Sequence, residues 1–261
     1  MTEAVQVEVR DRVAVLTLSR PDSGNAIDQE MADSLLKATL HIASDDAVRA
    51  VLLTGQGRAF CVGGDVKAFA ATGTGASALV DGLTASLHVA VARLARMDKP
   101  LVTAINGAAA GAGFGLAILG DVALAARSAK FAMAYGAIGL TPDGGATWLL
   151  PRLVGFRQAQ RLALTGERID ATEAERIGLI TRVIDDDALQ AEALAVATTL
   201  AQGPRLAFAR TRALLHQSLS NGLETQLERE ARGIAEAIAG PEGQEGIAAF
   251  VARRPADFSG L

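Results

Sequence analysis

Three short apolar segments of the chain are each followed by a loop rich in glycine and alanine. Residues 50–54 precede GQGRAFCVGGDVKAF, residues 101–105 precede NGAAAGAGFG, and residues 122–125 come before IGLTPDGGATWLL. Short apolar runs bounded by turn residues are typical of buried strands, and α/β proteins place ligands in the loops that follow their strands. We therefore expect an α/β body whose candidate site is formed by these loops.

Other local patterns complete this outline. Alternation of valine with polar residues over 5–18 predicts a β-hairpin leading into a buried strand. Asp28 stands where a helix N-cap is expected, and a helix is predicted from about Ala85 to Met97. The small residues at 72–80 predict a mobile loop before that helix, and helical spacing dominates 186–239. The sequence thus predicts a β/α first part and a helical second part.

Composition excludes several classes of protein. The net charge of -4 supplies no excess of cations for nucleic acid. One cysteine, Cys61, cannot form an intrachain disulfide or a cysteine-rich zinc site, and three scattered histidines argue against a metal cluster. The opening MTEAVQVEVRDR is polar, and we found no apolar run long enough for a membrane span. We expect a soluble cytoplasmic protein with neither a nucleic-acid nor a membrane partner.

The second loop, with Gly111-Ala112-Gly113-Phe114-Gly115, resembles a dinucleotide-binding turn, but its spacing is G-x-G-x-G rather than G-x-G-x-x-G. Glycine and alanine also let a ligand oxygen approach backbone N–H groups, so two facing loops of this kind can form an oxyanion hole for a thioester or ester carbonyl. Close packing at crowded turns explains the same composition. From composition alone both interpretations stay open.

The third loop contains a carboxylate, Asp143, between two apolar runs. Pro-Asp-Gly is ordinary turn chemistry, whereas a carboxylate in a semi-apolar pocket is suited to proton transfer. His88 is a candidate general base or an inert helical histidine. Tyr135 lines a pocket or fills the core, and Cys61 is expected to be a small buried residue.

Taken together, the loops resemble the crotonase, or enoyl-CoA hydratase/isomerase, superfamily. The resemblance runs from about Val5 to Pro255 and rests on five motifs in the right order. They are Arg20-Pro21 with Asn25-Ala26, the segment 59–67 (AFCVGGDVK), the segment 99–113 (KPLVTAINGAAAGAG), the segment 164–171 (LTGERIDA) and the segment 174–180 (AERIGLI).

The resemblance implies a spiral of ββα turns over residues 1–195 and a helical trimerisation region over 196–261, giving a homotrimer or a dimer of trimers. It also implies an acyl-CoA thioester substrate, with no cofactor besides the coenzyme A that the substrate carries. The Gly64 and Ala112 N–H groups would bind the thioester oxygen. Residues implied to bind coenzyme A or the acyl group are Ala26, Asp65, Val66, Lys67, Tyr135, Phe250 and Arg253, the last two from this or a neighbouring subunit.

One departure from the family pattern bears on the reaction. The two glutamates of the hydratases are replaced by Gly115 and Tyr135, while the Asp143 loop resembles that of the 1,2-epoxyphenylacetyl-CoA isomerase subgroup. The resemblance therefore implies an acyl-CoA isomerase in which Asp143 shuttles a proton on a thioester enolate. Alternatives are a hydratase without the glutamate pair, an aromatic acyl-CoA dehalogenase or hydrolase with Asp143 as nucleophile, and a non-catalytic acyl-CoA-binding scaffold.

Overall fold

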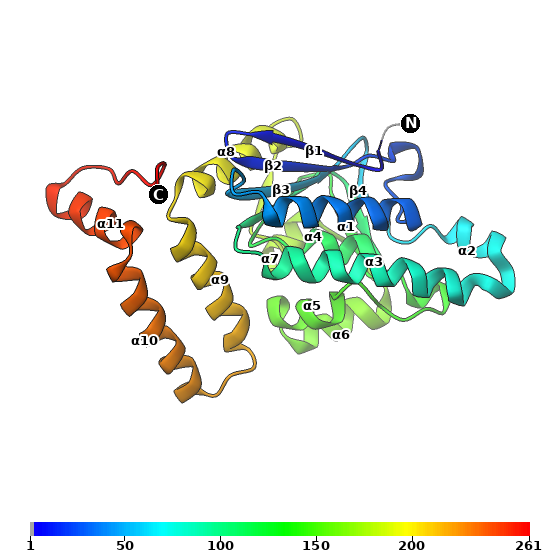
Figure 1. The fold of residues 1–261 in the computed structure, drawn as a ribbon. Helices are drawn as coiled ribbons and strands as arrows, with labels where there is room; N and C mark the ends of the chain where they lie inside the picture. The colour runs from blue at the N-terminus through cyan, green and yellow to red at the C-terminus, as the bar shows by residue number, and fades with distance from the viewer. Residues whose placement is uncertain (1–2) are drawn as a thin grey trace.

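The body of the chain is built on two β-sheets in the computed structural model, which describes residues 3–261 (Figure 1). The larger sheet has the order β1-β2-β3-β5-β7-β10; β1 and β2 form the predicted antiparallel hairpin, and each later neighbour is parallel. Its strands are β1 (Val5–Arg10), β2 (Val13–Leu18), β3 (Ala50–Gly55), β5 (Leu101–Ile105), β7 (Val122–Ala126) and β10 (Arg182–Ile184).

The smaller sheet contains β4 (Ala59–Cys61), β6 (Ala108–Ala110), β8 (Lys130–Ala132) and β9 (Ile169–Asp170), in that order. The chain alternates between the sheets, from β3 to β4, from β5 to β6 and from β7 to β8. Each turn therefore adds one strand to each sheet. This arrangement, with helices between turns, confirms the expected α/β spiral of ββα turns.

The parallel strands of the smaller sheet determine where the glycine-rich loops lie. β4 pairs with β6 and β6 pairs with β8, all in parallel. The carboxyl ends of parallel neighbours lie at one edge of a sheet, where α/β proteins bind ligands. The segments after β4, β6 and β8, which hold Gly64, Ala112 and Tyr135, must therefore come together.

Helices α1 (Gln29–Ser44) and α3 (Ala76–Arg96) lie side by side over the body (Figure 1). Asp28 is the N-cap of α1 as predicted, since its side chain accepts a hydrogen bond from the Met31 N–H at 2.9 Å. The predictions for 72–80 and for the start of the next helix are wrong. α2 (Val66–Thr72) and a 3-10 turn (Gly73–Gly75) lead directly into α3, because the alanines after Gly75 favour a helix.

By length and composition alone, the helical stretch Val66–Arg96 is apolar enough to cross a membrane, although our sequence analysis found no such run. In the structure, one face of α3 packs into the core of the body through Leu83, Leu87 and Leu94. Its other side carries exposed residues such as His88 and Arg96. The burial is that of a one-sided core helix.

The second half of the chain is largely helical, as expected. α8 (Leu189–Gln202) buries Leu189, Ala193, Ala197 and Ala201 against the body, and the predicted boundary after residue 195 lies inside it. α9 to α11 then extend away from the sheets (Figure 1). The remaining α-helices are α4 (Ala112–Ala117), α5 (Ala146–Val154), α6 (Phe156–Thr165), α7 (Ala171–Arg176), α9 (Arg205–Ser218), α10 (Leu223–Ala239) and α11 (Pro241–Ala252).

A buried arginine holds α9 to the body. The Arg212 guanidinium donates to the carbonyls of Leu94 and Met97 at the end of α3, and its Nε lies 2.7 Å from Asp121 Oδ2. These carbonyls have no partner within their own helix, so the guanidinium satisfies groups that would otherwise be unpaired. The position of α9 relative to α3 is thereby fixed.

Asn25 fixes the loop that precedes α1 onto β4. It adopts a left-handed conformation, with φ of 57°, and is fully buried. Its Nδ2 donates to the Ala59 carbonyl at 2.9 Å and to the Phe60 carbonyl at 3.1 Å, and its Oδ1 accepts from the Arg20 N–H at 2.9 Å. The Arg20-Pro21…Asn25-Ala26 motif therefore has a structural role in joining two segments.

Asn25→Ala is expected to lower the free energy of unfolding by about 3 kcal/mol. Losing bonds to buried carbonyls costs about 1–3 kcal/mol, and alanine in a left-handed conformation adds roughly 1 kcal/mol. Urea unfolding measures the change. Asn25→Gly is the control, because glycine removes the side-chain bonds without the conformational penalty and should be less damaging than alanine. Equal stability of the wild type and Asn25→Ala would contradict this role.

Candidate active site

The loops after β4 and β6 touch through their glycines. A Cβ atom at Gly63, which has φ of +96°, would lie 2.9 Å from the Ala110 carbonyl oxygen and 3.4 Å from the Ala112 nitrogen. A side chain at this position would push the loops apart. Glycine is therefore required here for the close approach of the two backbones, which places Gly64 and Ala112 on neighbouring segments.

The backbone N–H groups of Gly64 and Ala112 are both left for a ligand by the local hydrogen bonding. Ala112 is the first residue of α4, where an N–H has no partner inside the helix. The segment 63–65 bonds to Ile27 through the Gly63 carbonyl and the Asp65 N–H, so the Gly64 N–H takes no part in that bridge. The arrangement is compatible with the predicted oxyanion hole.

Asp143 lies beside this pair of loops. Tyr135, in the segment after β8, donates a hydrogen bond from its hydroxyl to Asp143 Oδ1 at 2.5 Å. On the other side, His88 Nε2 of α3 is 3.7 Å from Asp143 Oδ2. The next residue, Gly144, packs against Ala112, since a Cβ at Gly144 would be 3.7 Å from the Ala112 Cα. The structure thus brings Asp143, Tyr135, His88 and Ala112 together.

The exposures of these groups differ. The Asp143 side chain is 28% exposed and that of His88 is 50% exposed. The Asp143 carboxylate therefore contacts protein groups on one side and remains accessible to solvent. Burial, followed by the neighbouring Asp143 carboxylate, raises the pKa of Tyr135, which stays protonated and able to donate. Cys61, the last residue of β4, is fully buried, and burial raises its pKa to about 12. It is the small core residue that we predicted.

Gly115 has no space for a side chain. A Cβ atom there would lie 2.9 Å from the Gly144 carbonyl oxygen, so the Asp143-Gly144 turn occupies the volume that a larger residue would need. Tyr135, the second position where the family resemblance would place a glutamate, instead supports Asp143. Gly115 and Tyr135 therefore both border the Asp143-Gly144 turn.

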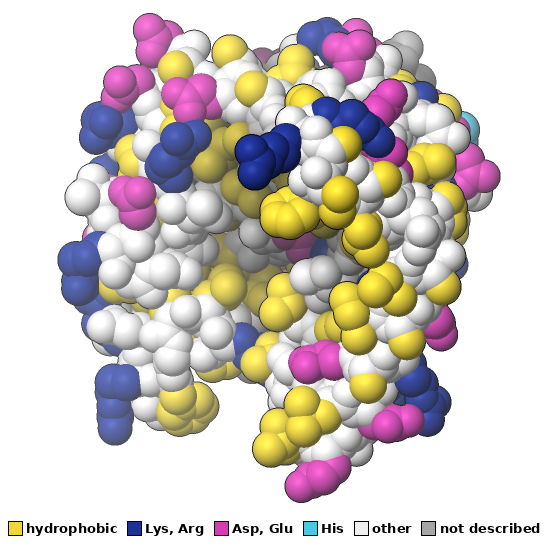
Figure 2. Space-filling view, turned by 90° about the vertical axis from the view of Figure 1, so that its left-hand side faces the viewer, with side chains coloured by type: hydrophobic (Ala, Val, Ile, Leu, Met, Phe, Trp, Pro, Cys, Tyr) yellow, Lys and Arg dark blue, Asp and Glu magenta, His cyan; other side chains and the backbone are white. Residues whose placement is uncertain are grey.

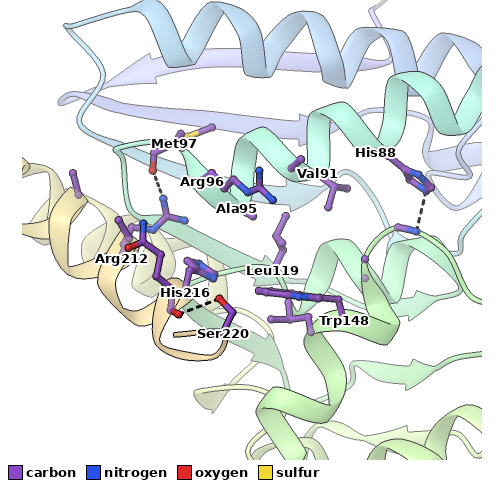
Figure 3. A pocket seen from close by; sticks show the side chains of 18 residues that line it. His88, Val91, Ala95, Arg96, Met97, Leu119, Trp148, Arg212, His216 and Ser220 are labelled. Atoms are coloured by element: carbon purple, nitrogen blue, oxygen red, sulfur yellow. Dashed lines mark hydrogen bonds between the residues drawn. The ribbon is translucent and has the colours of Figure 1, made fainter. Parts of the chain in front are cut away.

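A cavity of about 770 Å³ opens beside this site, between α3, α5 and α9 (Figure 3). At one end it is lined by His88, Gly115 and Gly144, which are neighbours of Asp143, although Asp143, Gly64 and Ala112 are not among its lining residues. Toward α9, Trp148 stacks on His216 with ring centroids 6.0 Å apart and an interplanar angle of 27°. Burial, then Arg212, lowers the pKa of His216. No sequence pattern indicates this cavity, because its lining residues come from separate parts of the chain.

The residues expected to bind coenzyme A form two separate groups. Ala26, Asp65, Val66 and Lys67 lie near one another, because Arg20 donates to the Ala26 carbonyl at 2.6 Å and lies 3.5 Å from Asp65. The sequence analysis did not assign a site role to Arg20. Phe250 and Arg253 belong to α11 and its end, which lie at the opposite end of the molecule from α2 (Figure 1). One chain alone does not bring the two groups together, and their contact remains a prediction for a neighbouring subunit.

Within residues 3–261, no group of three His, Cys, Asp or Glu side chains is arranged to hold a metal ion. The site described above offers backbone donors, the Tyr135 hydroxyl, the His88 imidazole and the Asp143 carboxylate.

The chain belongs to the enoyl-CoA hydratase/isomerase family, whose model matches residues 8–260. It is 39% identical to the 1,2-epoxyphenylacetyl-CoA isomerase of Escherichia coli strain K12 over 100% of both chains. It is 33% identical to the 2,3-dehydroadipyl-CoA hydratase of the same strain, also over 100% of both. A solved enoyl-CoA hydratase from Polaromonas sp. JS666 is 33% identical and has the same fold, with a TM-score of 0.93 over 97% of this chain and 98% of that one.

Proposed function

We propose that this member of the family is an acyl-CoA isomerase. The observation that carries the proposal is the position of Asp143, beside the Ala112 loop and hydrogen-bonded to Tyr135, where its own turn fills the space at Gly115. A single held carboxylate can remove a proton and return it. The 39% identity to a relative named as an isomerase supports the same reaction class.

The proposed mechanism begins with the thioester carbonyl between the Gly64 and Ala112 N–H groups. Asp143 removes a proton from the acyl chain, and the electron pair of the broken C–H bond moves onto the thioester oxygen as an enolate. Each N–H donor stabilises this charge by roughly 3–4 kcal/mol. Asp143 then delivers a proton to another carbon, which moves a double bond, or, where the enolate electrons break a C–O bond of a strained ring, to the oxygen released. Neither outcome involves net oxidation or addition of water.

The nucleotide end of the substrate is proposed to lie at Ala26, Asp65 and Val66, with Lys67 against a phosphate. Lys67 is exposed at the start of α2, so its ammonium is free to meet an anion. The acyl group would extend from the site toward the cavity lined by Leu119 and Trp148. No cofactor other than the substrate's own coenzyme A is needed for this reaction, and we place it in the cytoplasm.

We also propose that the chain forms a homotrimer or a dimer of trimers through its C-terminal helices. α10 has no buried residue, yet its apolar residues Leu223, Leu227, Ile234 and Ile238 are all at least half exposed. Figure 2, which views the molecule from the side of these helices, shows hydrophobic side chains gathered around a hollow. Apolar surface of this extent is typical of a protein interface.

Light scattering after size exclusion is expected to give the mass of three or six chains. Ile234→Glu should shift the protein to smaller species, since burying an unpaired carboxylate in an interface is unfavourable. Ile234→Leu is the matched control and should keep the oligomer. A monomeric wild type at micromolar concentration would overturn the assembly that we propose.

A second candidate function is hydrolytic dehalogenation of an aromatic acyl-CoA. Asp143 would attack the ring carbon and displace halide, and water would then hydrolyse the aryl ester at the Asp143 carbonyl carbon; His88 lies near enough to activate that water. The Gly144 N–H donates to His88 Nε2 at 3.2 Å, which occupies the nitrogen that would act as base. Turnover in ¹⁸O-water separates the two functions. Hydrolysis through Asp143 would transfer label into its carboxylate, and isomerisation would leave it unlabelled.

The proposed function is tested by incubating the protein with a 3-enoyl-CoA, a 2-enoyl-CoA and a phenylacetyl-type epoxide thioester. Isomerisation changes the retention time of a product but leaves its mass equal to that of the substrate. A product heavier by one water would make the protein a hydratase, in agreement with the names of several relatives. Binding of all three without turnover would favour the non-catalytic scaffold.

A further inference from the structure

The two oxygens of the Asp143 carboxylate have different surroundings. Oδ1 accepts a hydrogen bond of 2.5 Å from the Tyr135 hydroxyl. Oδ2 is 3.7 Å from His88 Nε2, which is beyond hydrogen-bond distance. The carboxylate is therefore asymmetric: Oδ1 already accepts one hydrogen bond, whereas both lone pairs of Oδ2 are open to a proton.

Tyr135 is held in place as the donor to Oδ1. It stands three residues after the end of β8, and its ring lies against the neighbouring loop, since a Cβ atom at Gly111 would be 3.9 Å from the Tyr135 Cζ. Burial raises the pKa of the phenol, so the hydroxyl keeps its proton over the working pH range. The titratable groups that face it are Asp143 and, more weakly, the buried Cys61.

His88 is prevented from donating to Oδ2. Its Nε2, the ring nitrogen nearest Oδ2, accepts the Gly144 N–H at 3.2 Å (Figure 3). The Gly144 amide therefore occupies this nitrogen, and Oδ2 is left without a hydrogen bond from His88.

We propose that Tyr135 is a positioning residue that reserves Asp143 Oδ1 and makes Oδ2 the oxygen that takes and returns the substrate proton. This inference rests on the proposed function, in which Asp143 is the acid–base group. Oδ2 takes a proton from one acyl carbon, exchanges it with solvent and delivers a proton to a second carbon, while the Tyr135 proton stays on its own oxygen. Tyr135 thus fixes the direction of the reactive oxygen and stabilises the charged carboxylate.

Tyr135→Phe tests this role, because phenylalanine keeps the ring but cannot donate. The expected result is a roughly tenfold lower kcat with little change in KM, since the free carboxylate rotates. The acid side of the kcat profile should also move to higher pH, because the charged carboxylate loses a hydrogen bond. A purely structural role would lower the melting temperature without moving the pH profile.

Ser86→Ala is a matched control. The Ser86 hydroxyl donates to the Asp33 carboxylate at the same distance, 2.5 Å, outside the site. Its removal should leave the pH profile unchanged, which shows that the Tyr135→Phe effect is not common to any lost hydroxyl–carboxylate bond.

A second measurement uses the fact that the chain contains one tyrosine. Growth on 3-fluorotyrosine labels position 135 alone with a more acidic phenol, which should move the acid side of the pH profile to lower pH. The ¹⁹F signal should shift in Asp143→Asn, and not in Asp33→Asn. If Asp143→Asn abolishes turnover but Tyr135→Phe and fluorotyrosine leave the profile unmoved, this inference is wrong and the proposed function stands. If Asp143→Asn is fully active, the proposed function fails, and the inference with it, whatever the ¹⁹F signal shows.

Discussion

Asp143→Asn is expected to lower kcat for isomerisation by about 10²–10⁴-fold, the range that a positioned acid–base group contributes. The amide has nearly the shape of the carboxylate, and its oxygen can still accept from the Tyr135 hydroxyl. It cannot take a proton from carbon at neutral pH. The loss should therefore appear in kcat, with the affinity for acyl-CoA and the melting temperature close to those of the wild type. The effect is measured by steady-state kinetics with an acyl-CoA thioester that the wild type converts.

Asp33→Asn controls for the change of charge. Asp33 accepts hydrogen bonds from Gln29 and Ser86 on the exposed side of α1 and α3, away from the site. It should keep the activity of the wild type. Turnover by Asp143→Asn within tenfold of the wild type would show that another group moves the proton.

Ala112→Pro is expected to lower kcat by about 10²–10³-fold, because it removes one of the two N–H donors to the enolate oxygen. The substitution is tolerable for the backbone. Ala112 is the first residue of α4, where proline is favoured and the N–H makes no bond within the helix. Kinetics and a far-UV circular dichroism spectrum together separate a lost donor from a lost fold.

Ala112→Gly is the matched variant, since it changes the side chain at the same buried position and retains the N–H. It should stay within about tenfold of the wild type. Equal damage by glycine and proline would mean that packing against Gly144, rather than hydrogen bonding to the substrate, matters at this position.

The parts of the fold that depend on local chemistry could be predicted from the sequence. Asp28 caps a helix through its own side chain, and the valine alternation over 5–18 forms the hairpin. The strand-then-glycine pattern places Gly64 and Ala112 on neighbouring segments, because the strands before them are parallel partners. The boundaries at 72–80 could not be predicted, since this segment mixes glycines, which disfavour a helix, with alanines, which favour one.

The contacts that give the site its chemistry depend on tertiary structure. Tyr135 and Asp143 are eight residues apart in an irregular segment, where no periodicity relates their side chains. The stack of Trp148 on His216 joins helices from different parts of the chain. A glycine is needed at position 115 because the Gly144 carbonyl lies too close for a side chain, and no local sequence pattern specifies that contact. Each of these contacts depends on how separate segments of the chain pack together.

The most direct test of proton shuttling by Asp143 is turnover in heavy water, followed by mass spectrometry of substrate and product. We predict that the product of the wild type contains deuterium at the carbon that regains a proton and no added water, since Asp143 is partly exposed and exchanges with solvent. Asp143→Asn should incorporate no deuterium in the same time. Net addition of heavy water, or equal deuterium incorporation by wild type and Asp143→Asn, would contradict the account.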